Sequence, residues 1–410
     1  MTKKSRSSRQ GGITFSPWIL IGGAVLVLLL AGSVFFSGRG GILNPPPSPP
    51  TVDITPIADQ PVTTLPRANV IQGEWYTLYF TKPTYPEKKE DRSGGVDEAL
   101  VADFDRAEKT IDVAVFDLRL PSIVNALARA AQRGVQVRVI VDYDANQGAK
   151  EFTDAVAQLE KAGVNVVKEQ RAALMHNKFA VIDKRWLWTG SMNFTPNGVY
   201  RNNNNMLRVT SAALIENYSN VFERLFSARA EVTSLKKIPN PRVALGNNVV
   251  LENYFSPNGG AQKAILDRLK AAQQSIRVTA FTFTDNAMAD TLKAKHKAGV
   301  KVQGVFEARS NSAIGAEYAS LKRAGVDIRE DGNCYILHSK LFIIDDKTVV
   351  MGSYNFTDAA NRVNDENVLI IDDPALAKQY IAEFNRLYQQ AQNPTVCGTN
   401  PALNESNTEQ

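Results

Sequence analysis

The chain repeats one pattern: residues 111–142 read IDVAVFDLRLPSIVNALARAAQRGVQVRVIVD, and residues 276–307 read IRVTAFTFTDNAMADTLKAKHKAGVKVQGVFE, at a constant offset of 165. In each copy a strand-like start leads into alanines and leucines at near 3.6 spacing, which predicts a helix. The helix stops at Gly134 or Gly299, and alternating valines then indicate a second strand. Each stretch therefore predicts a βαβ unit.

The duplication continues at an offset of 162, where Ala162-Gly163-Val164 matches Ala324-Gly325-Val326. The change of offset from 165 to 162 indicates a loop that differs in length by three residues, and loops tolerate such differences. Each half then has two short apolar strands, the second ending in Gly-Ser. We expect an α/β fold of two mixed-sheet halves flanked by helices, residues 71–235 and 236–392, related by a pseudo-twofold axis. A site at the seam between the halves would receive one copy of each repeated motif.

The strongest repeat carries chemically active side chains. Measured from His176 or His338, lysine falls at +2, aspartate at +7, serine at +15 and asparagine at +17. The residues in question are Lys178, Asp183, Ser191 and Asn193 in the first copy and Lys340, Asp345, Ser353 and Asn355 in the second. Because residues two apart on a strand share a face, each histidine should project together with its lysine. An imidazole beside a cation suits chemistry at phosphate.

This double motif, H-x-K-x4-D followed by G-S-x-N, resembles the signature of the phospholipase D superfamily over roughly residues 95–390. The resemblance implies one active site in the seam and two-step displacement at phosphorus through a phosphohistidine. It implies that the lysines and asparagines stabilise charge on the non-bridging oxygens, supported by the serines. It implies no metal and no cofactor, and one chain carrying both motifs should act as a monomer.

The two copies differ at the position where the family has a carboxylate that orients a histidine. Glu366 stands 28 residues after His338, whereas Asn204 stands 28 residues after His176. The histidines should therefore have different partners and different basicity. By resemblance to two-motif members, His176 is expected to be the nucleophile and His338 the general acid and base, with Glu366 as a further site residue. Should Asn204 impair the site, a non-catalytic binding domain is the alternative.

Three other groups are expected to have structural roles. Asp183 and Asp345 lie on the opposite strand face from the lysines, which indicates a salt bridge or turn contact. Asp142 with Asp144 is one possible pair of metal ligands, but two carboxylates without a third ligand favour a loop at a strand end. His296 lies in a basic helix, KAKHKAG, and is expected at the surface.

The N-terminal region predicts a membrane anchor. Residues 17–36 are uncharged and 20 long, and at about 1.5 Å per residue they span the ~30 Å hydrocarbon core. Basic residues in 1–16 without an acid place this end in the cytoplasm and the catalytic body outside. A cleaved signal peptide is the alternative.

The Pro/Thr-rich stretch 37–70 should be a linker, and 393–410 a flexible tail. In an oxidising compartment Cys334 and Cys397 have the option of forming one disulfide.

Composition leaves the substrate open. A net charge of +5, with 44% hydrophobic and 22% charged residues, excludes a wholly disordered chain and selects no ligand. The anchor favours a membrane phospholipid, cleaved as by phospholipase D. The alternatives are a metal-independent endonuclease, a cardiolipin synthase-like transferase and a binding domain. A nuclease would need basic contacts, for which Lys293, Lys295, Lys297, Lys301 and the run from Arg201 to Asn205 are candidates.

Overall fold

The computed structural model describes residues 65–228 and 237–397, all within one compact unit, Pro50–Gln410. The predicted cytoplasmic stretch, residues 1–16, and the predicted membrane segment, residues 17–36, lie outside the described residues. Within the described ranges, no helix is both long and apolar enough to span a bilayer.

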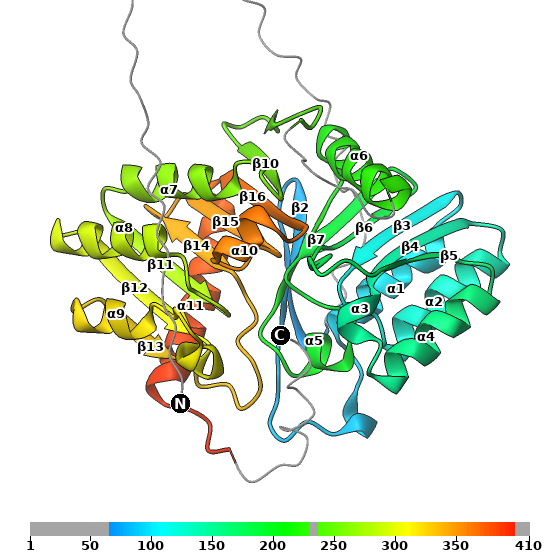
Figure 1. Ribbon diagram of the computed structural model, residues 1–410, viewed down its shortest axis with the longest axis horizontal. Helices are drawn as coiled ribbons and strands as arrows, with labels where there is room; N and C mark the ends of the chain where they lie inside the picture. Colours follow the sequence, from blue (N-terminus) through cyan, green and yellow to red (C-terminus); the bar gives the residue numbers. More distant parts are fainter. Residues whose placement is uncertain (1–64, 229–236, 398–410) are drawn as a thin grey trace, which may run out of the picture. The chain divides into compact units, whose positions relative to one another are not determined.

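The first half is built from eight strands and their connecting helices (Figure 1). Its elements are β1 (Ala68–Gln72), β2 (Tyr76–Thr81), η1 (Lys89–Asp91), α1 (Val96–Arg106), β3 (Thr110–Val115), α2 (Pro121–Gln132), β4 (Gln136–Asp142), α3 (Tyr143–Asn146), α4 (Lys150–Lys161), β5 (Asn165–Glu169), β6 (Lys178–Ile182), β7 (Trp186–Gly190), α5 (Pro196–Tyr200), β8 (Asn205–Val209) and α6 (Ala212–Ala228). The sheet has the order β1-β2-β8-β7-β6-β3-β4-β5.

The second half repeats this arrangement. Its elements are β9 (Arg242–Ala244), β10 (Val250–Ser256), α7 (Ala261–Ala271), β11 (Ser275–Ala280), α8 (Asn286–Lys297), β12 (Lys301–Phe306), η2 (Ala308–Ser312), α9 (Tyr318–Arg323), β13 (Asp327–Glu330), β14 (Leu341–Ile344), β15 (Thr348–Gly352), α10 (Asp358–Arg362), β16 (Glu366–Asp372) and α11 (Pro374–Gln392). The order β13-β12-β11-β14-β15-β16-β10-β9 matches the first sheet strand for strand, so the predicted duplication is confirmed.

The predicted βαβ units are present in both halves. β3 and β4 pair in parallel around α2, and β11 and β12 pair in parallel around α8. Gly134 and Gly299, just after the helices, have φ values of +90° and +89°. Only glycine adopts this left-handed conformation without steric cost, so these residues end the helices and turn the chain back to the sheet.

The core forms layers. Helices α1, α2 and α4 cover one face of the first sheet, and α7, α8 and α9 cover one face of the second. A third apolar cluster lies between the two sheets and includes residues of β6, β7, β14, β15, α6 and α11. The two halves therefore share a central core, which fixes the seam between them.

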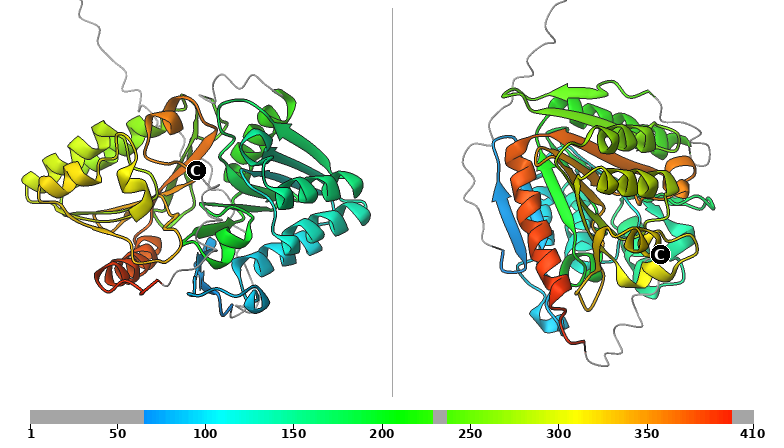
Figure 2. Two further views of the ribbon diagram at one scale, coloured as in Figure 1. Left: turned by 60° about the horizontal axis from the view of Figure 1, so that its bottom comes forward. Right: turned by 90° about the vertical axis from the view of Figure 1, so that its left-hand side faces the viewer.

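Contacts from α11 and its N-terminus join the second half to the first. The indole N–H of Trp75 donates to Asp373 at 2.8 Å, the hydroxyl of Tyr380 donates to Asn205 at 3.2 Å, and the rings of Phe80 and Tyr380 meet edge to face. Figure 2 shows the red C-terminal helix beside the blue strands of the first half. The seam is thus held by apolar packing and by buried hydrogen bonds.

The loop before α1 also crosses to the second half. The backbone N–H of Glu87 donates to the Tyr335 hydroxyl at 2.8 Å, and the Tyr85 ring lies 5.6 Å from the Tyr335 ring. Next to this contact, Cys334 and Cys397 form a disulfide. The optional pairing of the two cysteines is therefore present, and it fastens the end of the described chain close to the segment that leads to His338.

Candidate active site

Both predicted histidines lie at the seam, in short extended segments that precede β6 and β14. Each segment forms a parallel bridge with the other half: Met175 pairs with Asp365, and Leu337 pairs with Asn203. The backbone N–H of His176 donates to Asp365 O, and that of His338 donates to Asn203 O, both at 3.0 Å. The halves thus exchange backbone hydrogen bonds at the two residues that carry the chemistry.

His176 is held by a carboxylate of the other half. Its Nδ1 atom lies 2.9 and 2.8 Å from the two carboxylate oxygens of Glu366 at the start of β16. The Ser353 hydroxyl donates to the same carboxylate at 2.7 Å and accepts from the N–H of Asn367. Both side chains are buried, with His176 4% exposed and Glu366 0%. Burial raises the pKa of Glu366 to about 8, against the opposing charges of Lys178 and Lys340.

His338 has the corresponding arrangement with an amide. Its Nδ1 lies 3.0 Å from Asn204 Oδ1, which also accepts from the Ser191 hydroxyl at 2.8 Å. The amide group of Asn204 donates to Gly198 O at 2.9 Å, which turns its oxygen toward the imidazole. Because an amide oxygen only accepts, Nδ1 of His338 must carry the proton and Nε2 is left to exchange protons with a substrate. The expected difference between the histidines' partners is confirmed.

The two lysines lie beside the imidazoles. Lys178 Nζ donates to His176 O at 2.7 Å, and Lys340 Nζ donates to His338 O at 2.5 Å. Burial, together with the charges of both lysines, lowers the pKa of each histidine well below its usual value. The site is therefore electropositive and holds neutral imidazoles when empty, an arrangement that suits an anionic ligand.

A repeated aromatic residue was not singled out by the sequence reasoning. The Phe116 ring packs edge-on against His176, with centroids 5.2 Å apart, and the Phe281 ring packs in the same way against His338 at 5.0 Å. Each ring also faces the lysine of its own half. Both phenylalanines directly follow the first strand of their βαβ unit at an offset of 165, and this recurrence was the available signal.

The repeated asparagines complete the set. Asn193 is buried and Asn355 is partly buried, and within the described ranges the Oδ1 atom of each is buried without a hydrogen-bond partner. A buried polar atom without a protein partner is unusual in a folded protein and marks these amides as candidates for a functional role. The structure thus gathers the histidines, their lysines, the serines and Glu366 around the seam, with each asparagine close behind its serine in sequence.

Asp183 and Asp345 have the turn contacts that the sequence suggested. Asp183 accepts from the backbone N–H groups of Glu108, Lys109 and Thr110, and Asp345 accepts from those of residues 273–275. Burial alone would raise the pKa of each carboxyl, but the N–H groups lower it below the usual value. These aspartates tie strands together at the end of the sheet.

Asp142 and Asp144, the acidic pair near β4, do not form a shared metal site. Asp142 is buried, whereas Asp144 is exposed and accepts from Gln147. In the described part of the chain, no three His, Cys, Asp or Glu side chains are placed to hold a metal ion. His296 is partly exposed on α8.

Most of the residues proposed for nucleic-acid contact are buried or already paired with other groups of the protein. Asn202, Asn203, Asn204 and Asn205 are at most 2% exposed, so this part of the run that starts at Arg201 does not form the exposed basic surface that the nuclease alternative would use. Arg201 pairs with Glu87 at 2.8 Å. Lys293 contacts Asp290 and Ser320, and Lys295 donates to Ala272 O. Lys297 and Lys301 are exposed.

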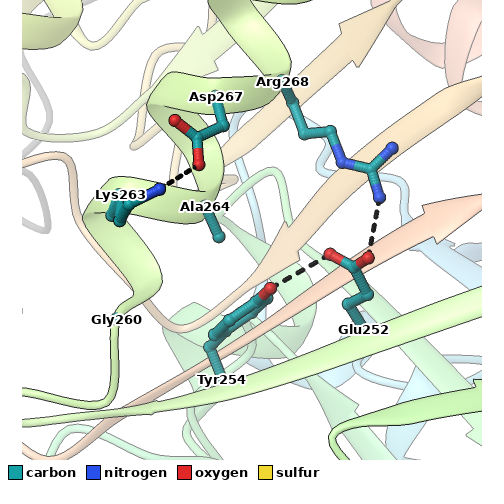
Figure 3. A pocket seen from close by; sticks show the side chains of 7 residues that line it. All are labelled: Glu252, Tyr254, Gly260, Lys263, Ala264, Asp267 and Arg268. Carbon is teal, nitrogen blue, oxygen red and sulfur yellow. Dashed lines mark hydrogen bonds and ion pairs between the residues drawn. The ribbon is translucent and has the colours of Figure 1, made fainter. Parts of the chain in front are cut away.

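A surface pocket of about 460 Å³ lies elsewhere, between β10 and α7 (Figure 3). Its charged side chains neutralise one another: Lys263 pairs with Asp267 at 2.6 Å, and Arg268 pairs with Glu252 at 3.0 Å. Tyr254 donates its hydroxyl to the same glutamate. The residues that line this pocket include none of the repeated motif residues.

Comparison with known proteins agrees with the duplicated site. The family described as "Cardiolipin synthase, PLD-like domain" matches twice, at residues 100–226 and 265–388. A phospholipase D of Rickettsia conorii is 31% identical over 163 residues, 40% of this chain and 82% of that protein. A mitochondrial cardiolipin hydrolase of Xenopus tropicalis is 35% identical over 122 residues, 30% of this chain and 58% of that protein.

A solved structure has the same fold over most of the chain. Phosphatidylserine synthase of Haemophilus influenzae superposes with a TM-score of 0.58 at 14% identity, covering 82% of this chain and 92% of that one. The double family match spans more than half of the chain and includes both histidine motifs. This chain belongs to the phospholipase D superfamily and is a phosphodiesterase built from two PLD-like halves.

Proposed function

We propose that this protein is a phospholipase D that hydrolyses glycerophospholipids to phosphatidic acid and a free head-group alcohol through a phosphohistidine on His176. The observation that carries the proposal is the cross-seam pairing of the histidines, one with a carboxylate and one with an amide. This asymmetry gives the two imidazoles different tasks in one site.

In the first step Nε2 of His176 attacks phosphorus. A bond forms between nitrogen and phosphorus, the bond to the head-group oxygen breaks, and His338 gives that oxygen a proton. Glu366 accepts the Nδ1 proton of His176 in a hydrogen bond and stabilises the positive imidazole ring. Lys178, Lys340 and the asparagine amides stabilise the charge on the non-bridging oxygens.

In the second step water attacks the phosphohistidine. His338, now neutral, accepts a proton from the water, the nitrogen–phosphorus bond breaks, and phosphatidic acid leaves. His338 thereby regains the proton that it gave up in the first step. One chain supplies every group in both steps, so a monomer completes the site.

A phospholipid is favoured over nucleic acid by three features. The relatives matched here include proteins named phospholipase D and cardiolipin hydrolase. The polar run that follows Arg201 is buried instead of forming a basic surface. The apolar segment at residues 17–36 would also keep the site beside a bilayer.

The test is to incubate the full chain in a chelator with vesicles of phosphatidylcholine and phosphatidylglycerol, whose glycerol hydroxyl is an acceptor for transfer, and, separately, with single-stranded DNA. Release of choline and phosphatidic acid is expected, with no DNA cleavage. Cleavage of DNA alone would make the protein a nuclease, and production of a diphosphatidyl lipid would make it a transferase. Loss of all activity in the chelator, with recovery in a divalent ion, would contradict charge stabilisation by lysine alone.

We further propose that the catalytic body lies outside the cytoplasmic membrane. The basic residues ahead of the apolar segment support this topology, and the Cys334–Cys397 disulfide suits an oxidising compartment. Protease added to intact cells should digest the body. Protection of the body until the cells are lysed would reverse the topology.

A further inference from the structure

We propose that Asp142 and Glu307 are positioning residues, each of which holds one catalytic histidine in place through the backbone of the residue before it. The inference rests on the proposed function for the roles of the histidines. It concerns two carboxylates that the mechanism above does not use.

In the first half, Asp142 ends β4 and is 1% exposed. Its Oδ2 atom accepts from the backbone N–H of Met175 at 2.9 Å, and its Oδ1 atom accepts from the N–H of Ala145 at 3.0 Å. One oxygen therefore caps the short helix α3, while the other reaches across to the residue next to His176.

In the second half, Glu307 directly follows β12 and is also 1% exposed. Its Oε2 atom accepts from the backbone N–H of Leu337 at 2.7 Å, and its Oε1 atom accepts from the N–H of Arg309 at 3.1 Å. Leu337 is the residue next to His338. The two carboxylates are 165 residues apart, and both kinds of contact recur although the side chain differs by one methylene group.

These N–H groups cannot be satisfied by the cross-seam bridges. In the first half the bridge uses the carbonyl of Leu174 and the N–H of His176, which bond to Asp365. In an extended segment the N–H of the intervening residue points to the other side. There it meets Asp142, so the segment before the imidazole is held from both sides. The second half repeats this with Ile336, His338 and Asn203.

Burial of these carboxyl groups is costly, which argues that the contacts are needed. Burial raises the pKa of Asp142 to about 6 and that of Glu307 to about 8, and the backbone N–H bonds only partly offset this. An apolar or amide side chain would avoid the cost. An amide, however, has one accepting oxygen and would set its NH2 group against one of the two N–H donors.

The expected effect differs between the halves because each carboxylate serves one histidine. Loss of the Met175 contact should displace His176 and slow formation of the phosphoenzyme. Loss of the Leu337 contact should displace His338, and with a substrate whose leaving group needs no protonation only the hydrolysis step should slow. Misplacement by about 1 Å costs roughly 100-fold in rate.

The experiment compares Asp142→Asn and Glu307→Gln in the full chain with bis(4-nitrophenyl) phosphate, following the nitrophenol burst and the phosphoenzyme trapped in alkaline denaturant. We expect Asp142→Asn to form phosphoenzyme roughly 10- to 100-fold more slowly and to accumulate less of it. We expect Glu307→Gln to form it at nearly the wild-type rate and to accumulate more, with hydrolysis slowed by a similar factor. KM should change little in either variant.

Asp373→Asn is the matched control. Asp373 is 5% exposed, caps α11 through the N–H groups of Ala375 and Leu376, and accepts from Trp75, but it contacts no histidine segment. It should lower the thermal midpoint without changing the ratio of the two steps. All variants are assayed below the lowest midpoint.

Two results would overturn the inference: both variants slowing both steps equally, or both matching the control. If Asp142→Asn does not fold, Asp142→Glu and Glu307→Asp keep the charge and change the side-chain length by one methylene group. These variants should give weaker effects in the same directions. A wild type without any phosphohistidine would instead refute the proposed mechanism. The positioning role would then be judged by whether kcat falls at constant KM in both variants and not in the control.

Discussion

The imidazole of His176 and the carboxylate of Glu366 lie 2.8 Å apart although they belong to opposite halves of the chain. Because the partner comes from the other half, neither half contains a complete acid–base pair. The duplication is therefore functional as well as structural. It also makes the catalytic state of His176 depend on the ionisation of a buried glutamate in the other half.

The first prediction concerns this ionisation. Burial raises the pKa of Glu366 to about 8, so below that pH the pair holds an extra proton and Nε2 of His176 is not free to attack. Loss of the proton as the pH rises leaves Nδ1–H facing a carboxylate and frees Nε2. With bis(4-nitrophenyl) phosphate, whose leaving group needs no proton from His338, kcat/KM should therefore rise with pH, by about tenfold per unit, and level off above about 8.

Glu366→Gln should remove this limb of the profile and lower the plateau by roughly 10²- to 10⁴-fold. The limb reports on the coupled pair and not on one residue. The measurement is the pH profile of kcat/KM for both proteins. A limb that persists unchanged in Glu366→Gln would assign the titration to another group.

The second prediction concerns the amide at the matching position. In Asn204→Asp a carboxylate oxygen would face Gly198 O, to which the Asn204 amide now donates. The loss of a buried donor should destabilise the protein by about 1–3 kcal/mol and should not increase activity. Chemical denaturation measures the change. Asn125→Asp, at an exposed position where the oxygen accepts from Gln158, is the control and should be nearly neutral.

The third prediction is proton uptake on anion binding. In the empty site, burial and the two lysines lower the pKa of His338, so the general acid lacks its proton. A bound anion opposes the lysine charges and should raise that pKa. Sulfate, which does not titrate near neutral pH, should therefore bind with net proton uptake. Calorimetry in buffers of different ionisation enthalpy measures the uptake, which should decrease in His338→Asn. Equal uptake in both proteins would contradict this source of the proton.

The fourth prediction concerns the disulfide. Cys334 and Cys397 are 63 residues apart in sequence, and closing a loop of that length restricts the unfolded chain by about 4 kcal/mol. Reduction, or replacement of both cysteines by serine, should lower the unfolding free energy by up to this amount. Non-reducing peptide mapping should recover the linked peptides. Two free thiols in protein isolated from the cell would contradict both the bond and an oxidising location.

The sequence predicted more about the paired motifs than about their surroundings. A constant offset revealed the βαβ units and both histidine motifs because an intact repeat preserves spacing. Spacing alone cannot show which half a partner contacts, and the exchange of Glu366 and Asn204 across the seam depends on how two sheets pack. The contacts of Asp142 and Glu307 were hidden for the same reason, since a carboxylate at a strand end is also an ordinary helix cap.

The last prediction separates the roles of the two histidines. His176→Asn removes the attacking nitrogen and should abolish the phosphoenzyme. His338→Asn should still form it from bis(4-nitrophenyl) phosphate, because nitrophenolate leaves without a proton, and should then stall because water has no general base. The second protein should show a nitrophenol burst of about one equivalent with little turnover. Trapping in alkaline denaturant, in which a nitrogen–phosphorus bond survives, and peptide mapping of the wild type identify the modified residue. The structure favours His176, since Glu366 stabilises the positive charge that its ring acquires on attack, whereas Asn204 only accepts a hydrogen bond from His338. Label on His338 in the wild type would reverse the two roles, and absence of label on both histidines would exclude the covalent route.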